Sequence, residues 1–249
     1  MGRTFEALKK AESEHLVSAG ETGVLLPNVD TKPHMPLRLR LSSNTTEEYH
    51  RLKQNVLLAD WETDSVSLLF VSPTEGEGTT TVMVQFASTL ASSGERVVLV
   101  DANFRHPTLH DVFNVERTSG FSELLTQRSL LKSAIRETEF KNLFVIPNGN
   151  PLTNPSSLLA SSATEEVLKQ LREEGQWILF DCAPITRYSD GAALAPKVDG
   201  VVIIIEAERT KREVAKDAKE RLLAPNTKIL GAVLNRRKTH IPEWLYRRL

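Results

Sequence analysis

One stretch of this chain, residues 71–81, limits its possible folds more than any other. Its sequence is VSPTEGEGTTT, and it lies between a short apolar run, 67–71, and a stretch with helical periodicity, 79–93. A strand, a glycine turn and a helix start form the layout of a phosphate-binding loop, where backbone N–H groups converge on an anion at a positive helix N-terminus. The usual pattern has a lysine after the last glycine, whereas Gly78 is followed here by Thr79.

The remainder of the chain alternates between short apolar strands and amphipathic helices. Strands are expected at 67–71, 96–100, 142–147, 177–180, 201–205 and 229–234, and helices at 46–59, 79–93, 121–125, 131–137, 163–174 and 210–223. This alternation predicts an α/β fold with a doubly wound, mostly parallel sheet and helices on both faces. Ligands of such sheets bind at the carboxyl ends of the strands, where the loop 71–80, Asp101 and Asp181 are expected to meet.

Bulk composition excludes several classes of protein. The net charge of −1 gives no general attraction to nucleic acid. Cys182 is the single cysteine, which precludes an internal disulfide and favours the cytosol. The longest wholly apolar run, 201–205, is far too short to cross a bilayer. Residues 209–249 hold twelve Lys/Arg against four Asp/Glu, which indicates either a solvated face or contact with a membrane surface, an acidic partner or nucleotide phosphate.

The two ends of the chain differ from its centre. Residues 4–14 are predicted to form a short amphipathic helix, and 15–42 a linker rich in Gly and Pro. We therefore expect three parts: an N-terminal helix and linker, 1–43; a central domain, 44–238; and a basic, aromatic tail, 239–249. The tail, with its Trp-Leu-Tyr patch at 244–246, is either a helix docked on the domain or a docking peptide for a membrane partner.

The candidate site residues each allow a structural alternative. Gly76 and Gly78 can make a tight turn, and the hydroxyls of 79–81 can cap a helix. Asp101 leaves the end of a buried strand, where a carboxylate needs a partner such as Mg²⁺, an activated hydroxyl, a helix start or Arg105. Asp181 ends the apolar strand WILFD, a pattern typical of aspartates that hold Mg²⁺ in nucleotide-binding sheets.

Seven motifs together resemble the cytoplasmic domain of the bacterial tyrosine kinases of capsule and exopolysaccharide synthesis. These are P-loop NTPase-fold proteins related to the cell-division and partition ATPases. The resemblance covers roughly 44–236, and its motifs are EEYHRLKQN (47–55), SPTEGEGTTT (72–81), VVLVDANFRHPTLH (97–110), TSGFSELL (118–125), VIPNGNPLTNPSSLL (145–159), ILFDCAPI (178–185) with Asp190 after it, and ILGAVLN (229–235).

The resemblance implies a ligand, a metal ion and a partner. The ligand is ATP or ADP with Mg²⁺, and the implied cofactor-binding residues are Gly76, Glu77, Gly78, Thr79, Thr80, Thr81 and Asn235. Thr80, Asp101 and Asp181 are the implied metal ligands, and Asp101, Asp181 and Arg105 the implied catalytic residues, with Arg105 as a substitute cation. The implied partner is the cytoplasmic segment of a membrane polysaccharide co-polymerase, at the inner face of the cell membrane, with a homo-oligomer possible and no nucleic acid.

The departures from the family pattern bear on activity. Thr79 stands at the lysine position, Asn103 replaces the second aspartate of its motif, and the ring-forming Glu-x-x-Arg-x-x-Arg helix reads Glu47, His50, Lys53. The C-terminal tyrosine cluster is missing. Two hypotheses follow: a regulator of polysaccharide chain length or export with impaired or absent kinase activity, or a working tyrosine kinase or ATPase with altered chemistry. A partition-type ATPase is disfavoured, since such loops carry a further lysine where this chain has 72–75, SPTE.

Overall fold

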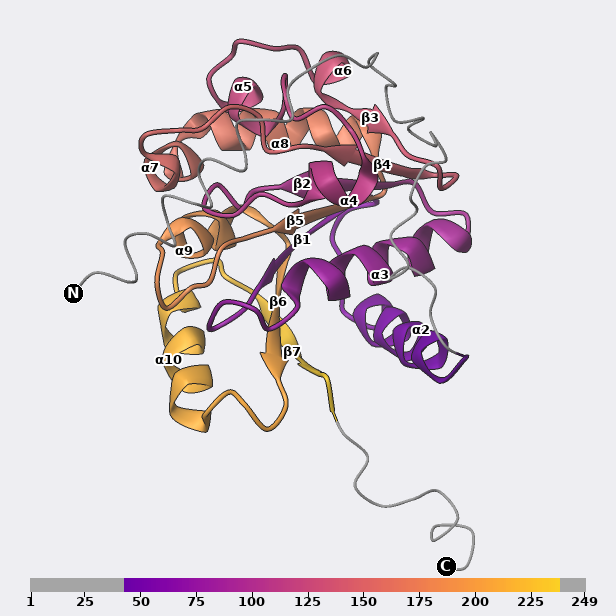
Figure 1. The fold of residues 1–249 in the computed structure, drawn as a ribbon, viewed down its shortest axis with the longest axis vertical. Helices are drawn as coiled ribbons and strands as arrows, with labels where there is room; N and C mark the ends of the chain where they lie inside the picture. Colours follow the sequence, from indigo (N-terminus) through magenta and orange to yellow (C-terminus); the bar gives the residue numbers. More distant parts are fainter. Residues whose placement is uncertain (1–42, 238–249) are drawn as a thin grey trace, which may run out of the picture. The chain divides into compact units, whose positions relative to one another are not determined.

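The structure is a computed structural model that describes residues 43–237 (Figure 1). The predicted helix at 4–14, the linker at 15–42 and the aromatic tail lie outside the described residues.

A seven-stranded sheet forms the centre of the described domain, in the order β3-β4-β2-β5-β1-β6-β7 (Figure 1). β3 and β4 are antiparallel, and every other neighbouring pair is parallel. The strands are β1 (Val66–Val71), β2 (Val97–Asp101), β3 (Arg136–Glu137), β4 (Leu143–Ile146), β5 (Trp177–Asp181), β6 (Gly200–Glu206) and β7 (Ile229–Asn235). The predicted mostly parallel α/β sheet is confirmed.

Helices cover both faces of this sheet, and the alternation of side chains along the strands divides the core accordingly. Leu68 and Phe70 of β1 pack toward α2 (Ser43–Leu57), α3 (Thr79–Ser92) and α4 (Leu109–Phe113). Leu69 and Val71 pack toward the opposite layer. That layer consists of α5 (Phe121–Leu125), α6 (Leu131–Ala134), α7 (Pro155–Ala160), α8 (Ser162–Glu174), α9 (Asp190–Leu194) and α10 (Arg212–Leu222), with a 3₁₀ turn, η2 (Ala195–Lys197), after α9.

The predicted helix at 131–137 is wrong in its second half. α6 ends at Ala134, Ile135 is extended (φ −73°, ψ 130°), and Arg136 and Glu137 pair with β4. Tertiary pairing at the sheet edge therefore overrides a weak helical pattern. The short helices α4, α7 and α9 were not predicted. Helices of five or six residues show little helical periodicity, although α5, of the same length, was predicted.

The strand order places three chain segments at one edge of the sheet. β5 lies between β1 and β2, so that Asp181 is opposite Phe70 on one side and Asp101 on the other. The loop after β1 begins at the same edge. Within residues 43–237, none of the helices combines the length and apolar composition that a bilayer crossing requires.

Candidate functional site

The loop between β1 and α3 is shaped by two glycines in the left-handed region. Gly76 has φ 81° and Gly78 has φ 89°, and α3 begins directly after Gly78. A Cβ on Gly78 would lie 2.3 Å from Asn235 Nδ2, so the end of β7 approaches the loop too closely for any side chain there. Asn235 Nδ2 donates a hydrogen bond of 2.7 Å to the Glu77 carbonyl, which holds the loop against β7. Asn235 thus fixes the loop backbone against the end of β7.

Glu77 stabilises the loop through the hydrogen bonds of its carboxylate. Its side chain is buried. The carboxylate accepts hydrogen bonds from the Thr74 N–H (3.0 Å), the Thr74 hydroxyl (2.5 Å) and the Glu206 N–H (3.3 Å). The expectation that Glu77 contacts a cofactor therefore has no support from its side chain, which faces the protein and does not line the cavity described next.

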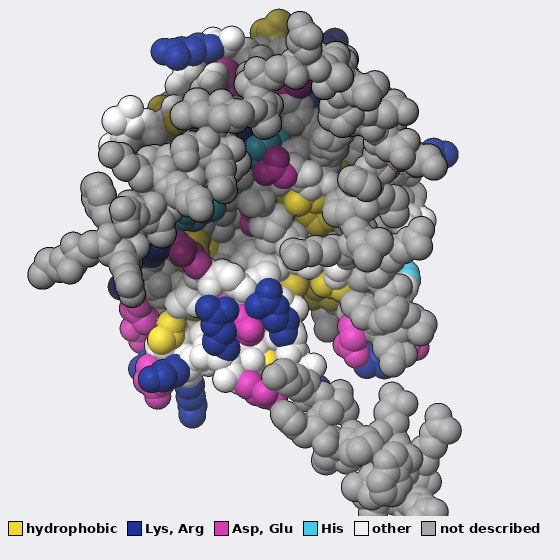
Figure 2. All heavy atoms as spheres, viewed as in Figure 1, with side chains coloured by type: hydrophobic (Ala, Val, Ile, Leu, Met, Phe, Trp, Pro, Cys, Tyr) yellow, Lys and Arg dark blue, Asp and Glu magenta, His cyan; other side chains and the backbone are white. Residues whose placement is uncertain are grey.

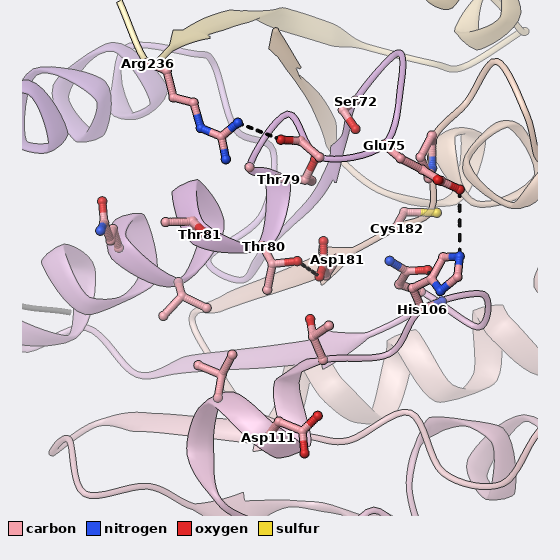
Figure 3. A pocket seen from close by; sticks show the side chains of 18 residues that line it. Ser72, Glu75, Thr79, Thr80, Thr81, His106, Asp111, Asp181, Cys182 and Arg236 are labelled. Carbon is pink, nitrogen blue, oxygen red and sulfur yellow. Dashed lines mark hydrogen bonds and ion pairs between the residues drawn. The ribbon is translucent and has the colours of Figure 1, made fainter. Parts of the chain in front are cut away.

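A cavity of about 620 Å³ opens on the other side of the loop (Figure 3). It lies between the loop, the first turns of α3, the segment that follows β2, and the end of β5. Its lining includes Gly76, Gly78, Thr79, Thr80, Thr81, Asn103, His106, Asp111, Asp181 and Arg236. The structure thus brings together most of the predicted loop residues and Asp181 around one cavity.

Asp181 and Thr80 form the polar centre of this cavity. The Thr80 hydroxyl donates a hydrogen bond of 2.5 Å to Asp181 Oδ2 (Figure 3). Asp181 is fully buried, and its Oδ1 has no hydrogen-bond partner among residues 43–237. Burial and, second, the charge of Asp101 raise the pKa of Asp181 to about 8, against which the Thr80 hydroxyl and the Cys182 N–H act weakly. A buried, unpaired carboxylate oxygen facing a cavity is an unsatisfied ligand position.

These residues fit a magnesium ion of the kind that nucleotides bring. Mg²⁺ is usually held by one or two carboxylates together with substrate phosphates, and it keeps several waters. Within residues 43–237 there is no group of three or more His, Cys, Asp or Glu side chains arranged as a metal cage. The Asp181 oxygen and the Thr80 hydroxyl match the former arrangement, in which phosphates complete the coordination.

Asp101 occupies a different position from the one its predicted role requires. Its Oδ2 accepts hydrogen bonds from the N–H groups of Thr108 and Leu109, both at 3.0 Å, and its Oδ1 accepts one from Asn103 at 3.2 Å. Burial raises the pKa of Asp101 to about 6, although these three hydrogen bonds oppose the rise. The carboxylate therefore caps the start of α4, the structural alternative, and a catalytic or metal-binding role for Asp101 remains a prediction.

The structure also directs Arg105 away from the loop. Its guanidinium forms a bidentate ion pair with the buried Asp190, in which Nε donates to Oδ2 (2.9 Å) and Nη2 donates to Oδ1 (3.0 Å). The guanidinium carbon also lies 4.7 Å from the ring centre of Tyr188. The Asp190 carboxylate holds the pKa of Arg105 above its ordinary value. Arg105 does not line the cavity, and its role as a catalytic residue and substitute cation remains a prediction.

One residue at the cavity was not identified from the sequence. Arg236 follows β7 directly, and its Nη1 donates to the Gly76 carbonyl at 2.9 Å (Figure 3). The same nitrogen contacts Glu206 Oε2 at 3.0 Å. The sequence signal was the excess of basic residues after 209, together with the position of Arg236 at the carboxyl end of a parallel strand. That excess could not single out one arginine.

Comparison with known proteins places this site in a family. A family model described as an AAA domain matches residues 71–219. Tyrosine-protein kinase YwqD of Bacillus subtilis is 32% identical over 79% of this chain and 83% of its own length. The solved chimerical protein CapA2B2 is 28% identical, covers 80% of this chain and 87% of its own, and superimposes with a TM-score of 0.75. The kinase domain of VpsO is 30% identical over 78% of this chain and 96% of its own, with a TM-score of 0.69. The chain belongs to the family of bacterial tyrosine-protein kinases with an AAA-type, P-loop domain, as a member whose phosphate loop carries Thr79 in place of the lysine.

Proposed function

We propose that this protein binds ATP or ADP with Mg²⁺ in the cavity beside the phosphate loop, and that its phosphoryl transfer is impaired. One observation carries the proposal: Thr79 lies in the cavity at the lysine position, next to a Thr80–Asp181 pair that keeps a buried, unpaired oxygen. The part of the site suited to the metal is present, whereas the cation expected on the helix start is absent.

Nucleotide binding is supported by the shape and the polar groups of the site. Gly76 and Gly78 keep the loop backbone free of side chains, and α3 presents its N-terminus to the cavity. Thr80 and Asp181 would hold Mg²⁺. When bound, the ion supplies charge neutralisation for the β- and γ-phosphates. Asn235 supports the loop through its hydrogen bond to the Glu77 carbonyl, and a direct contact of Asn235 with the nucleotide remains a prediction.

Impaired transfer is supported by the chemistry of Thr79. The loop lysine neutralises phosphate charge and stabilises the charge that develops during transfer. A hydrogen bond from a charged donor contributes about 1.5–3 kcal/mol, so its loss weakens binding by roughly ten- to a hundredfold. Transfer falls further, because it depends on interactions that strengthen in the transition state.

The biological role in this proposal is regulatory. The protein would act at the inner face of the cell membrane with the cytoplasmic segment of a polysaccharide co-polymerase, and influence capsule or exopolysaccharide chain length or export. Its support is family membership and the motif resemblance to kinases of capsule and exopolysaccharide synthesis. In this proposal 44–238 is the nucleotide-binding unit, and the tail 239–249 either docks on this unit or binds the membrane partner.

A second candidate is an active ATP-dependent tyrosine kinase or ATPase that modifies a partner. It is favoured by the intact Thr80–Asp181 pair and by the guanidinium of Arg236 at the loop. Both candidate functions require nucleotide binding, and they differ in whether the protein transfers the phosphoryl group of ATP at an appreciable rate.

The two candidates are separated by measuring ADP·Mg²⁺ and ATP·Mg²⁺ binding by calorimetry, and phosphotyrosine formation with and without the partner's cytoplasmic segment, for the wild type and Thr79→Lys. We expect wild-type binding, little phosphotyrosine, and a gain of both in Thr79→Lys. Robust wild-type phosphorylation that Asp181→Asn abolishes would replace the regulator by the active kinase. Absence of binding in both proteins would contradict the proposal as a whole.

A further inference from the structure

Three charged residues gather at Gly76 on the side of the loop where β6 and β7 end. Glu206 closes β6, Arg209 follows it within one turn, and Arg236 follows β7. Both arginines contact the same carboxylate oxygen, Glu206 Oε2, Arg209 at 2.8 Å and Arg236 at 3.0 Å. We refer to Glu206, Arg209 and Arg236 as the arginine clamp.

The clamp is attached directly to the phosphate loop. Arg236 Nη1 donates a hydrogen bond of 2.9 Å to the Gly76 carbonyl, and Arg209 Nη1 lies 3.4 Å from the position of a Cβ on Gly76. Glu206 itself donates its N–H to the Glu77 carboxylate. The loop backbone therefore positions the guanidinium of Arg236 directly, whereas Arg209 is held beside the loop by Glu206.

The arginine clamp carries the same net charge as the lysine that the phosphate loop lacks. Two arginines and one glutamate give a net charge of +1, which equals that of the missing lysine. The other charged groups near the loop balance one another or are buried: Glu75 pairs with Arg187 at 2.7 Å, and Glu77 accepts hydrogen bonds inside the loop. Within the clamp itself, one positive charge is therefore not balanced by Glu206.

Of the two arginines, Arg236 faces the cavity. It lines the same cavity as Thr79, Thr80 and Asp181, and Figure 3 shows its guanidinium reaching the loop close to Thr79. Its side chain is 53% exposed, and within the described part of the chain only Nη1 is engaged in a side-chain hydrogen bond. The remaining donors of its planar group suit phosphate oxygens, which guanidinium binds through paired N–H groups.

We propose that Arg236, held in place by Glu206, supplies from the end of β7 the positive charge for nucleotide phosphate that the loop lysine would otherwise supply. Arg209 neutralises Glu206 and leaves the charge of Arg236 available. This role rests on the proposed nucleotide binding, and it explains how a loop with Thr79 retains affinity for phosphate. The lysine and Arg236 would then be alternative sources of the same charge.

The test is a double-mutant cycle on the full-length protein, with the dissociation constant for ADP·Mg²⁺ as the readout. Arg236→Gln is expected to weaken ADP·Mg²⁺ binding by roughly ten- to a hundredfold in the wild-type background, the loss typical of one charged hydrogen bond. In the Thr79→Lys background, Arg236→Gln is expected to weaken ADP·Mg²⁺ binding by less than about threefold, since the lysine then supplies the positive charge. Arg236→Lys keeps the charge without the paired donors, so its affinity is expected to lie between those of the wild type and Arg236→Gln.

Arg221→Gln is the matched control, because Arg221 lies on α10 and pairs with Asp217 at 2.9 Å, outside the cavity lining. Its affinity is expected to equal that of the wild type. Each substitution at Arg236 or Arg221 should leave the melting temperature of its background unchanged, because both arginines are exposed. Wild-type affinity in Arg236→Gln, or an equal loss in the wild-type and Thr79→Lys backgrounds, overturns the role of Arg236 alone. Absence of ADP·Mg²⁺ binding in every protein, Thr79→Lys included, overturns the proposed nucleotide binding and this role with it.

Discussion

The Thr80 hydroxyl and the Asp181 carboxylate share a hydrogen bond of 2.5 Å that ties the first turn of α3 to the end of β5. This bond crosses the place where a nucleotide-bound metal would lie, next to a threonine at the lysine position. The unpaired Asp181 Oδ1 carries a desolvation cost that nothing in residues 43–237 offsets. A cost of this kind is expected where a ligand completes the site.

The buried carboxylate of Asp181 makes stability depend on pH. A carboxyl whose pKa is raised in the folded state, here from 3.8 to about 8, favours folding fully below pH 3.8, and this contribution is lost as the pH rises toward 8. Asp181→Asn removes the effect. Without nucleotide, the free energy of unfolding of the variant relative to the wild type should rise by about 4 kcal/mol between pH 5 and pH 8.5.

Denaturant unfolding across this pH range measures the Asp181 effect. Asp64→Asn, at an exposed aspartate, serves as the control and should run parallel to the wild type. Parallel curves for Asp181→Asn and the wild type would show that Asp181 is ionised in the folded protein without penalty.

Thr80 is predicted to couple nucleotide binding to Mg²⁺. Thr80→Ala removes both the hydroxyl that would contact the metal and the donor that favours the ionised form of Asp181. ADP affinity in Mg²⁺ should fall about tenfold, while affinity in EDTA stays the same, because a charge-assisted hydrogen bond contributes about 1.5–3 kcal/mol. Calorimetry in both buffers measures this.

Thr80→Ser keeps the hydroxyl and is the matched control, with affinity expected within about threefold of the wild type. An equal loss in Mg²⁺ and in EDTA would mean that Thr80 acts on the loop and not on the metal.

The contact between Gly78 and Asn235 predicts different costs for two glycine substitutions. Gly78 and Gly94 both have positive φ, 89° and 97°, so alanine strains the backbone by about 1 kcal/mol at either site. Only at Gly78 does the new Cβ meet a side chain, Asn235 Nδ2 at 2.3 Å, whereas nothing lies within 4 Å of a Cβ at Gly94. Gly78→Ala should therefore cost at least about 1 kcal/mol more than Gly94→Ala in chemical denaturation. Equal costs would mean that Asn235 moves aside freely.

The sheet could be predicted from the sequence because its strands are buried on both faces. All residues of β1, β2 and β5 are buried, so that these strands read as continuous apolar runs that end at polar residues. The loop was equally visible, since its glycines and threonines are local in sequence. Edge strand β3 was not visible, because it has two residues and depends on β4 for its pairing.

Only those site residues whose role is set by their neighbours in the sequence could be predicted. Asp101 and Asp181 end strands in the same way, yet Asp101 accepts hydrogen bonds from three N–H groups, two of them at the start of α4, whereas Asp181 keeps an unpaired oxygen in the cavity. The difference arises from the segment 102–109, which folds back over Asp101. Arg236 was missed for a similar reason: it lies 160 residues from Gly76, and only the parallel order of β1, β6 and β7 brings the two together.

The capping role of Asp101 predicts a loss of stability without a loss of affinity. Asp101→Ala leaves three N–H groups without their acceptor and should destabilise the domain by about 2–4 kcal/mol, whereas Asp101→Asn keeps one oxygen and should cost less. Calorimetry on the folded Asp101→Asn protein should give an ADP·Mg²⁺ affinity within about threefold of the wild type. A tenfold loss with an unchanged melting temperature would instead make Asp101 a metal ligand.

Arg105 is predicted to be a structural residue, and its partner provides the test. Arg105→Gln leaves Asp190, which is fully buried, with the hydroxyl of Ser156 as its remaining side-chain contact among residues 43–237. Breaking a buried ion pair from one side costs about 3–5 kcal/mol, and we expect about 2–3 kcal/mol here because the Arg105 side chain is 29% exposed. Adding Asp190→Asn removes the unpaired charge, so the double variant should recover part of this stability in chemical denaturation. ADP·Mg²⁺ affinity should stay within about twofold of the wild type in the folded variants, in contrast to Arg236→Gln. If Arg105→Gln lowers ADP·Mg²⁺ affinity, and the loss persists when Asp190→Asn restores stability, Arg105 would instead be assigned to phosphate binding.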